Sequence, residues 1–485
     1  MDLGYRTTTA LLSDLDARRI GSLELLDHLL ARAERYNPPI NAIVVRDVDQ
    51  ARERARQADA ARQRGESWGA LHGLPMTVKE CFDVAGLPTT AGSPALKANA
   101  AQRHADAVRR LVDAGAVIFG KTNVPLFAGD LQTYNDVYGT TNNPWNIACG
   151  PGGSSGGSAA ALAAGLTPLE LGSDIGGSIR NPAHFCGVYG HKPSYGVVSL
   201  RGHVPGAPNS LLQVDIAVAG PLARSADDLD LALSVMAGPD EFNAPAWRVE
   251  LPKPRHERLQ DYRIAVCADD PFCPVDTEIA ELIRTAAKAL SKDGAKVADA
   301  RPDLDFGRSF RAYYQMLAAT MSVGFPEPVM QGLEAKGRAA AIDSTAYGDL
   351  FARGATMRHA AYIKASAERQ NERAAWAAFF RDWDVFLCPV LMTAAFAHDQ
   401  SPDMLARHLT VNGKPRPYGD ALCWAGLIGN VRLPAATVPI GRTKAGLPVG
   451  MQIVGPYLED RTAIDVAKRL TGLIGGFTPP PGYGG

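Results

Sequence analysis

The chain has few cysteines, and none of them is spaced for pairing. Only seven of the 485 residues are cysteines, and no two of them form a C-x-x-C pair. They stand at positions 81, 149, 186, 267, 273, 388 and 423. Scattered cysteines in odd number argue against a disulfide framework and against a zinc site. We therefore expect a reducing compartment and no bound metal.

Excess charge and long apolar runs are also missing. Lysine and arginine number 50 against 51 aspartates and glutamates, so the net charge is −1. A chain without a basic excess lacks the feature that attracts nucleic acid or an anionic membrane. No apolar run approaches the ~20 residues that span a bilayer, and residues 1–6 lack a charged-then-apolar signal. These absences predict a cytoplasmic protein with neither nucleic acid nor membrane as a partner.

The residues that are present predict an α/β fold. With 46% hydrophobic residues, the chain can bury a large core. Periodicity predicts helices at 8–19, 22–36 with Ser22 as its N-cap, 48–64, 104–114 and 277–293. Short apolar runs predict strands at 74–79, 116–120, 188–191, 263–266, 385–389, 436–440 and 449–454. Helices that alternate with strands indicate a central mixed sheet covered by helices on both faces.

No linker of domain-joining length and no internal repeat interrupts the chain, so residues 1–485 are expected to form a single domain. Helices occupy its first part, 1–65, and a core follows at 70–240. Residues 300–385 form a helical region rich in alanine and aromatic residues, with Tyr313, Tyr314 and Met316 clustered. Residues 385–470 are expected to return to the same sheet.

Two glycine-rich loops that contain serine lie within residues 151–180. The first is Gly-Gly-Ser-Ser-Gly-Gly at 152–157, the second is Gly-Gly-Ser at 176–178, and the apolar run 159–166 between them is predicted to be a buried helix. Glycine in such clusters suggests backbone close to a ligand, or positive φ angles. The exposed amides of such loops can hold an anion, which could be a transient oxyanion or a phosphate.

Three interpretations of the first loop compete. Residues 152–156 match the nucleophile motif G-x-S-x-G, but that motif needs a strand running into the serine, and residues 142–151 have the composition of a loop. A phosphate-binding loop would continue with G-K-[ST], which is absent here. A flexible linker is disfavoured because the apolar run that follows is typical of a buried segment.

The stretch closely resembles the amidase signature family, whose two serines have the interval found here. Ser154 and Ser178 are 24 positions apart. The resemblance extends to LHGLPMTVKE at 71–80, GKTNVP at 120–125 and CGVYGHKP at 186–193. Several separated motifs in the same order imply the amidase signature fold and a serine hydrolase. They depart from the usual pattern at Glu80, where aspartate is common, and at His191, where an aliphatic residue is common.

The resemblance implies a Ser-Ser-Lys relay. Ser178 would attack the carbonyl carbon, and Ser154 would carry the proton between Ser178 and an initially neutral Lys79. A serine hydroxyl needs such a base within hydrogen-bond reach, and a neutral lysine needs its pKa lowered from about 10.4 by burial or by nearby positive charge. From the residues alone, Lys121 and Lys192 are equally eligible, and only the family motif selects Lys79.

The resemblance also supplies the expected substrate-binding residues. The backbone amides of Ile175, Gly176, Gly177 and Ser178 would form the oxyanion hole. Residues 126–134 correspond to the wall of the acyl pocket and include Ala128, Gly129 and Asp130 as expected substrate-binding residues. The Ala128-Gly129 pair implies an open floor near the reacting carbonyl.

Neighbouring residues are expected to support the loops. Ser155 and Ser158 are predicted to be structural, as helix caps, and Asp174 and Arg180 to brace the nucleophile loop. The resemblance also implies that the peptide bond between Gly153 and Ser154 is cis. A Ser-His-Asp alternative, with Asp174 and one of the nearby histidines, is left open at this point. Those histidines are His184, His191 and His203.

The predicted function is the hydrolysis of a linear amide C–N bond to a carboxylate plus ammonia or an amine, without metal or cofactor. The expected partner is a small-molecule amide, and a homodimer is compatible with the sequence. Within the family, the alternative is the glutaminase-type subunit of a tRNA-dependent amidotransferase. Outside it, residues 152–157 could serve a nucleotide-binding module. An inactive interaction protein is disfavoured because all three reacting residues are present.

Overall fold

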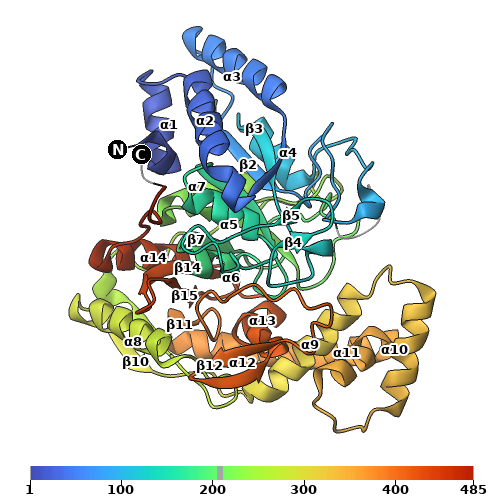
Figure 1. Ribbon diagram of the computed structural model, residues 1–485. Coiled ribbons are helices and arrows are strands. Elements are labelled where there is room, and N and C mark those ends of the chain that lie inside the picture. Colours follow the sequence, from blue (N-terminus) through green and yellow to red (C-terminus); the bar gives the residue numbers. More distant parts are fainter. Residues whose placement is uncertain (1, 205–210, 484–485) are drawn as a thin grey trace.

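Eleven strands assemble into one sheet that mixes parallel and antiparallel neighbours (Figure 1). In the described residues, two further pairs stand apart from it: β4 (Tyr134–Asn135) with β5 (Gly139–Thr140), and β12 (His408–Val411) with β13 (Lys414–Pro417). The computed structural model describes residues 2–204 and 211–483, so 205–210 of the expected core lie outside the described residues. The order across the eleven-stranded sheet is β1 (Ile43–Arg46), β3 (Val117–Thr122), β2 (Pro75–Lys79), β6 (Leu169–Asp174), β8 (Val218–Ala223), β7 (Tyr189–Lys192), β14 (Ala435–Arg442), β15 (Pro448–Val454), β11 (Val385–Pro389), β9 (Arg263–Val266) and β10 (Lys296–Asp299). The predicted α/β fold is confirmed.

All seven predicted strands are present, but the strand that carries much of the site was missed. Every residue of β6 is buried, although its sequence LELGSD contains two acids and a glycine. Glu170 accepts hydrogen bonds from the hydroxyls of Thr77 and Thr122, and burial raises its pKa to about 8. A protonated, hydrogen-bonded carboxyl can be buried at low cost, which explains a strand that hydrophobic patterning does not reveal.

Helices cover the sheet on both sides. They are α1 (Thr8–Asp16), α2 (Ser22–Ile40), α3 (Val48–Gln63), α4 (Asp106–Asp113), α5 (Gly156–Ala163), α6 (Arg180–Cys186), α7 (Ala226–Met236), α8 (Thr277–Lys292), α9 (Phe306–Met321), α10 (Glu327–Ala339), α11 (Tyr347–Ala355), α12 (His359–Asp382), α13 (Cys423–Asn430) and α14 (Asp460–Ile474). Helices α4, α7, α14 and α8 contact one another in a row, and α5 contacts α6. Within the described ranges, no helix combines the length and the apolar composition needed to cross a membrane.

The N-terminal helices differ in detail from their predictions. Helix α1 ends at Asp16 instead of residue 19, because Arg18 adopts a left-handed backbone with φ of 55°. Helix α2 continues through Pro38 to Ile40. Ser22 is not the N-cap of α2: Gly21 holds that position, and the Ser22 hydroxyl instead donates to the carbonyl of Gly73.

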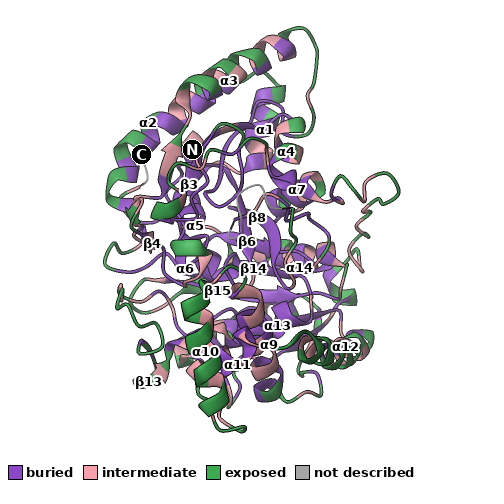
Figure 2. Ribbon diagram, turned by 90° about the vertical axis from the view of Figure 1, so that its right-hand side faces the viewer, coloured by how far each residue is buried: buried purple, intermediate pink, exposed green. Residues whose placement is uncertain are grey.

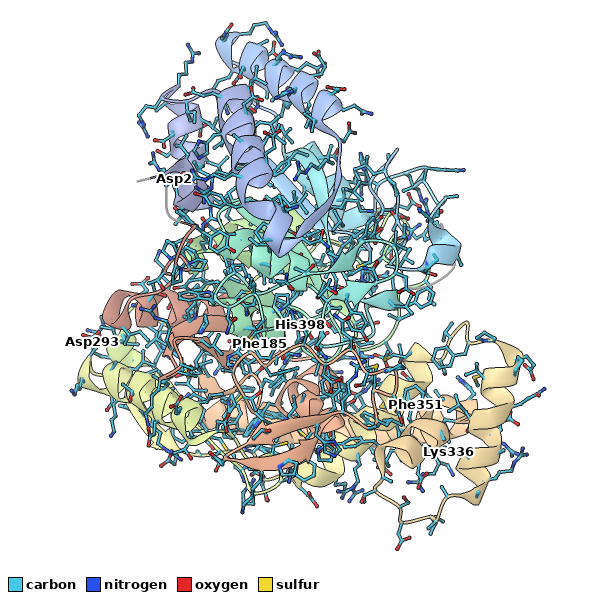
Figure 3. The ribbon with its side chains drawn as sticks, in the orientation of Figure 1. Asp2, Phe185, Asp293, Lys336, Phe351 and His398 are labelled. Carbon is cyan, nitrogen blue, oxygen red and sulfur yellow. The ribbon has the colours of Figure 1, made fainter. Side chains whose placement is uncertain are left out.

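The helical region predicted at 300–385 consists of α9 to α12. Helices α10 and α11 project from the body at the right of Figure 1, and Figure 3 places Lys336 and Phe351 on this projection, away from Phe185. No residue of α10 is buried, and the exposed faces of α10 and α12 are evident in Figure 2. By contrast, α9 buries Tyr313 and Tyr314 against the body. Helix α9 therefore joins the projection to the core.

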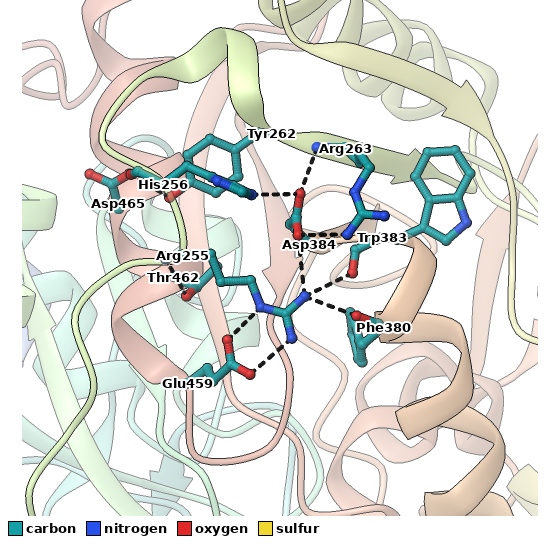
Figure 4. A network of polar contacts seen from close by, with 10 residues as sticks. All are labelled: Arg255, His256, Tyr262, Arg263, Phe380, Trp383, Asp384, Glu459, Thr462 and Asp465. Atoms are coloured by element: carbon teal, nitrogen blue, oxygen red, sulfur yellow. Dashed lines mark hydrogen bonds and ion pairs between the residues drawn. The ribbon is translucent and has the colours of Figure 1, made fainter.

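A network around Arg255 ties three segments of the second half of the chain together (Figure 4). Its guanidinium donates to the carboxylate of Glu459, to the carboxylate of Asp384 and to the carbonyls of Phe380 and Trp383. Asp384 is buried and also accepts from the Arg263 amide at 2.8 Å. The network fixes the end of α12 against the strands that carry the C-terminal half of the sheet.

We expect Arg255→Ala to destabilise the protein. The change leaves the buried Asp384 with fewer donors, and removing one partner of a buried ion pair costs about 3 kcal/mol of unfolding free energy. Arg258→Ala is the matched control, because its pair with Asp261 lies at the surface with side-chain exposures of 72% and 41%. Denaturant unfolding of both variants checks the prediction. Equal midpoint shifts in the two variants would contradict the role of the network.

Candidate active site

Lys79 ends β2, which lies between β3 and β6 in the sheet. Strands β2 and β6 are parallel, so their carboxyl ends meet at one edge, where ligands of α/β sheets usually bind. Lys79 is fully buried, and its Nζ donates to the hydroxyls of Ser154 at 2.7 Å and of Ser173 at 2.9 Å. Burial lowers the pKa of Lys79, while Cys81 and Asp174 act in the opposite direction. A lysine in this state can serve as a base.

The two other candidate lysines lie elsewhere. Lys121 donates to the carbonyl of Pro88 and to the hydroxyl of Thr89, and Lys192 donates to the carbonyl of Pro193. Burial also lowers the pKa of Lys192, to about 7. Neither lysine has a hydrogen bond to a serine of the two loops in the part of the chain that the structure describes. Geometry therefore selects Lys79, as the family motif does.

The first glycine-rich loop is packed against protein backbone. The peptide bond between Gly153 and Ser154 is cis, as expected. A Cβ at Gly153 would collide with the carbonyl oxygen of Asp130, and a Cβ at Gly157 would collide with the amide of Asn123. Glycine is required because the neighbouring backbone leaves no room for a side chain. The linker interpretation is wrong, since residues 151–164 are all buried.

The second loop is built around Asp174. Its carboxylate accepts the amides of Gly177 at 2.9 Å and Ile179 at 3.1 Å, and the guanidinium of Arg180 at 2.8 Å. Burial alone would raise the pKa of Asp174, but Arg180, Lys192 and the Gly177 amide together lower it to about 2. A permanently ionised Asp174 therefore holds the loop in one conformation and braces it, as predicted.

This bonding bears on the expected oxyanion hole. The Gly177 amide already donates to Asp174, so it is not free for a substrate oxygen. Among the described residues, no hydrogen bond occupies the amides of Gly176 and Ser178. Tyr313 donates to the carbonyl of Ile175 at 3.0 Å, which fixes the turn ahead of them. The expected oxyanion hole stays a prediction: among the described residues the Gly177 amide is already engaged, whereas no hydrogen bond is made by the amides of Ile175, Gly176 and Ser178.

A pocket opens over Ser178, whose exposed fraction is 8%. The cavity has a volume of about 100 Å³, below the roughly 300–1,000 Å³ of sites for drug-sized ligands. The residues that line it are Ala128, Gly129, Asp130, Leu131, Ile175, Gly176, Ser178, Tyr314, Leu317, Met321, Met404, Leu405, Tyr418, Gly419 and Leu422. Ser178 and five of the six expected substrate-binding residues are in this lining. The sixth, Gly177, is not.

Asp130 is the one charged residue among those lining residues, and its charge is compensated. Arg407 donates to one carboxylate oxygen at 2.7 Å, and the hydroxyl of Tyr418 donates to the other at 2.6 Å. Arg407 and Tyr418 lie almost 300 residues from Asp130 in sequence, and nothing near Asp130 signals them. The pocket therefore offers an apolar surface beside a neutralised carboxylate.

The Ser-His-Asp alternative is not supported. His184 is bonded to backbone groups of Gly450 and Thr393, and His191 faces Asp460 at 3.0 Å. His203 contacts Ser173 at 2.8 Å. In the described segments, no histidine has a hydrogen bond to Ser154 or Ser178.

The serines predicted to be helix caps have other partners. The hydroxyl of Ser155 donates to the carbonyl of Ser173 at 3.4 Å, and that of Ser158 bonds Thr122 at 2.9 Å. Neither hydroxyl caps α5. The capping prediction is wrong, while the structural role stands. Glu80, the departure from the family pattern, accepts the amides of Thr90 and Ala91 and so holds the adjacent loop.

Comparison with known proteins shows which proteins the chain is similar to. The family model described as Amidase matches residues 24–464. A glutamyl-tRNA(Gln) amidotransferase subunit of Synechococcus sp. (strain CC9605) is 35% identical over 97% of this chain and 96% of its own length. A crystal structure of a bacterial aryl acylamidase of the amidase signature enzymes is 27% identical, with a TM-score of 0.81 over 97% of this chain and 96% of that chain. The corresponding amidotransferase subunit from Thermotoga maritima is 25% identical, with a TM-score of 0.78 over 99% of this chain and 98% of that chain.

These relatives contradict the expected absence of nucleic acid and confirm the expected family. The expectation that nucleic acid plays no part is contradicted, because the curated relatives are named as subunits of a glutamyl-tRNA(Gln) amidotransferase. The balanced net charge is a property of the whole chain and says nothing of what associated subunits bind. Family model, relatives and neighbouring structures agree on the remaining question: the chain belongs to the amidase signature family, a family of hydrolases that act on amide C–N bonds.

Proposed function

We propose that the protein cleaves a linear amide C–N bond through an acyl-enzyme on Ser178, with Ser154 as proton relay and Lys79 as base. The observation that carries this proposal is the 2.7 Å hydrogen bond from the buried Lys79 to Ser154, beside the pocket that Ser178 lines. The amide of Ser155 donates to the carbonyl of Ser178 at 3.1 Å, which joins the two serine loops directly.

The reaction would proceed by paired proton transfers. As the Ser178 oxygen bonds the carbonyl carbon, its proton passes to Ser154, and the Ser154 proton passes to Lys79. The amides of Gly176 and Ser178 stabilise the oxyanion. When the C–N bond breaks, the Lys79 ammonium returns a proton through Ser154 to the leaving nitrogen. Water then repeats the sequence on the acyl-enzyme and releases the carboxylate.

The curated relatives favour a glutaminase-type form of this activity. Three of the relatives most similar in sequence are each named as the same subunit of a glutamyl-tRNA(Gln) amidotransferase. In that form the chain would release ammonia from an amide donor for a second subunit, which acts on glutamyl-tRNA. Such a role agrees with the cytoplasmic location predicted from the sequence.

A stand-alone amidase is the second candidate, and the pocket lining favours it. Free glutamine carries an α-carboxylate and an α-ammonium group, whereas the described lining offers Leu317, Met321 and Leu422 beside an Asp130 already bound by Arg407. A charged group without a partner is costly to bury. The lining therefore suits a neutral, apolar acyl group.

Ammonia release from glutamine and from hexanamide separates the two forms. The protein alone should hydrolyse hexanamide with the higher kcat/KM if it is a stand-alone amidase. Glutamine hydrolysis that exceeds hexanamide hydrolysis, and that rises with glutamyl-tRNA and partner subunits, would establish the glutaminase-type form. The Ser178→Ala protein serves as the blank in both assays. Turnover of either amide by this blank would contradict the shared mechanism.

A further inference from the structure

Three residues that the mechanism does not use continue the hydrogen-bonded row behind Lys79. Lys79 donates to the Ser173 hydroxyl at 2.9 Å, and the Ser173 oxygen lies 2.8 Å from Nε2 of His203. The Cys81 sulfur lies 3.2 Å from the same nitrogen. The row therefore runs from Ser154 through Lys79 and Ser173 to His203, with Cys81 at its end.

The available donors and acceptors determine which group donates in each hydrogen bond of this row. A lysine ammonium has three donors and no acceptor. When Lys79 is protonated, the Ser173 oxygen must accept from it, and the Ser173 hydrogen must point elsewhere. Two acceptors lie within reach of that hydrogen: the Cys81 sulfur, which is a weak acceptor, and Nε2 of His203 at 2.8 Å, which accepts when the ring carries its hydrogen on Nδ1. The ring is held in place by its backbone bridge to Phe82 and by edge-on packing of the two rings, whose centroids are 4.8 Å apart.

We propose that His203 is a positioning residue for Lys79: by accepting the Ser173 hydroxyl hydrogen, it keeps Ser173 an acceptor toward Lys79, so that the lone pair of the neutral amine faces Ser154. The inference rests on the proposed relay. Without an acceptor at position 203, the Ser173 hydroxyl can turn and donate to Lys79. The amine would then present a hydrogen, and not its lone pair, to Ser154.

The surrounding charges are consistent with this role. Burial, with a further contribution from Lys79, lowers the pKa of His203 to about 3, so the ring stays neutral and Nε2 can accept. Burial raises the pKa of Cys81 to about 11, so it faces both His203 and Lys79 as a neutral thiol. Asp174, the remaining charged group that acts on Lys79, is bound by Arg180. Glu80 and Lys121 also act on the pKa of Cys81, in opposite directions.

The test compares His203→Phe with His203→Gln, because glutamine keeps an acceptor oxygen and phenylalanine does not. We expect kcat of His203→Phe to fall by up to about 100-fold, the loss that a misplaced reacting group causes. The acidic limb of its kcat/KM profile should move to lower pH, since a Ser173 hydroxyl that donates to the amine favours the neutral form of Lys79. His203→Gln should retain activity within a few fold and keep the original limb.

A double-mutant cycle with Ser173→Ala tests whether His203 acts through Ser173. The expected result is that His203→Phe causes no further loss in the Ser173→Ala background. His104→Phe is the matched control, since His104 is also partly exposed and accepts a backbone amide at 3.1 Å. Thermal unfolding of each variant shows whether it is folded.

An unchanged kcat and pH profile in folded His203→Phe, or additive losses in the double variant, would overturn the inference. Failure of the proposed function is recognised separately, in the unsubstituted protein. It would appear there as hydrolysis that survives Ser178→Ala, whatever residue stands at position 203.

Discussion

Replacing Ser178 with alanine is expected to abolish both amide turnover and covalent labelling by a fluorophosphonate. Loss of the attacking oxygen removes the acyl-enzyme itself, and such losses reach about 10⁶-fold in kcat. Ser154→Ala removes a proton-transfer group only, so its kcat should fall by about 10²–10⁴-fold. Ser178 should remain the labelled residue in that variant. Steady-state kinetics and the mass of the labelled protein measure both effects.

Ser155→Ala is the matched control for these two substitutions. Ser155 is buried in the same loop, and within the described part of the chain its hydroxyl bonds only the carbonyl of Ser173. Turnover should therefore stay within a few fold of the unsubstituted protein. If the Ser178→Ala protein were still labelled, on Ser154, the nucleophile and the relay would have to be exchanged in the mechanism.

Replacing Lys79 with methionine is expected to impair turnover severely in a protein that remains folded. Methionine fills most of the space without a base, so the loss should be about 10²–10⁴-fold or more. Burial lowers the pKa of Lys79, and only its neutral form accepts a proton. In the unsubstituted protein kcat/KM should therefore rise with pH to a plateau, and this limb should be absent from Lys79→Met. A pH series of kcat/KM for both proteins measures it.

Lys121→Met provides the control for that prediction, because Lys121 is equally buried but bonds Pro88 and Thr89. Its stability can fall, yet its pH limb should stay in place. If the acidic limb of the kcat/KM profile persisted unchanged in Lys79→Met, another group would titrate in the relay. The candidates would be His203 and Cys81, which belong to the hydrogen-bonded row behind Lys79.

The sequence was most informative where chemistry is local. Strands such as β9 and β11 are short apolar runs, and their predicted bounds agree with the structure. The strand predicted at 74–79 agrees with β2, which ends at Lys79. The spacing of Ser154 and Ser178 was recognisable because the glycines around them must fit against backbone, which leaves few acceptable substitutions.

Contacts between distant segments could not be predicted in the same way. Arg407 neutralises Asp130 from a position 277 residues away, and no local pattern connects the two. The engagement of the Gly177 amide depends on where the Asp174 side chain turns. His203 lies one hydrogen bond from Ser173, yet in the sequence it was one of three histidines of equal standing.

Mapping the covalent adduct tests the central claim most directly. The unsubstituted protein would be labelled with a fluorophosphonate, digested and analysed by peptide mass spectrometry with fragmentation between Ser154 and Ser178. The account predicts that the modification lies on Ser178, on the peptide that contains Gly176 and Gly177. A modification on Ser154 would contradict it.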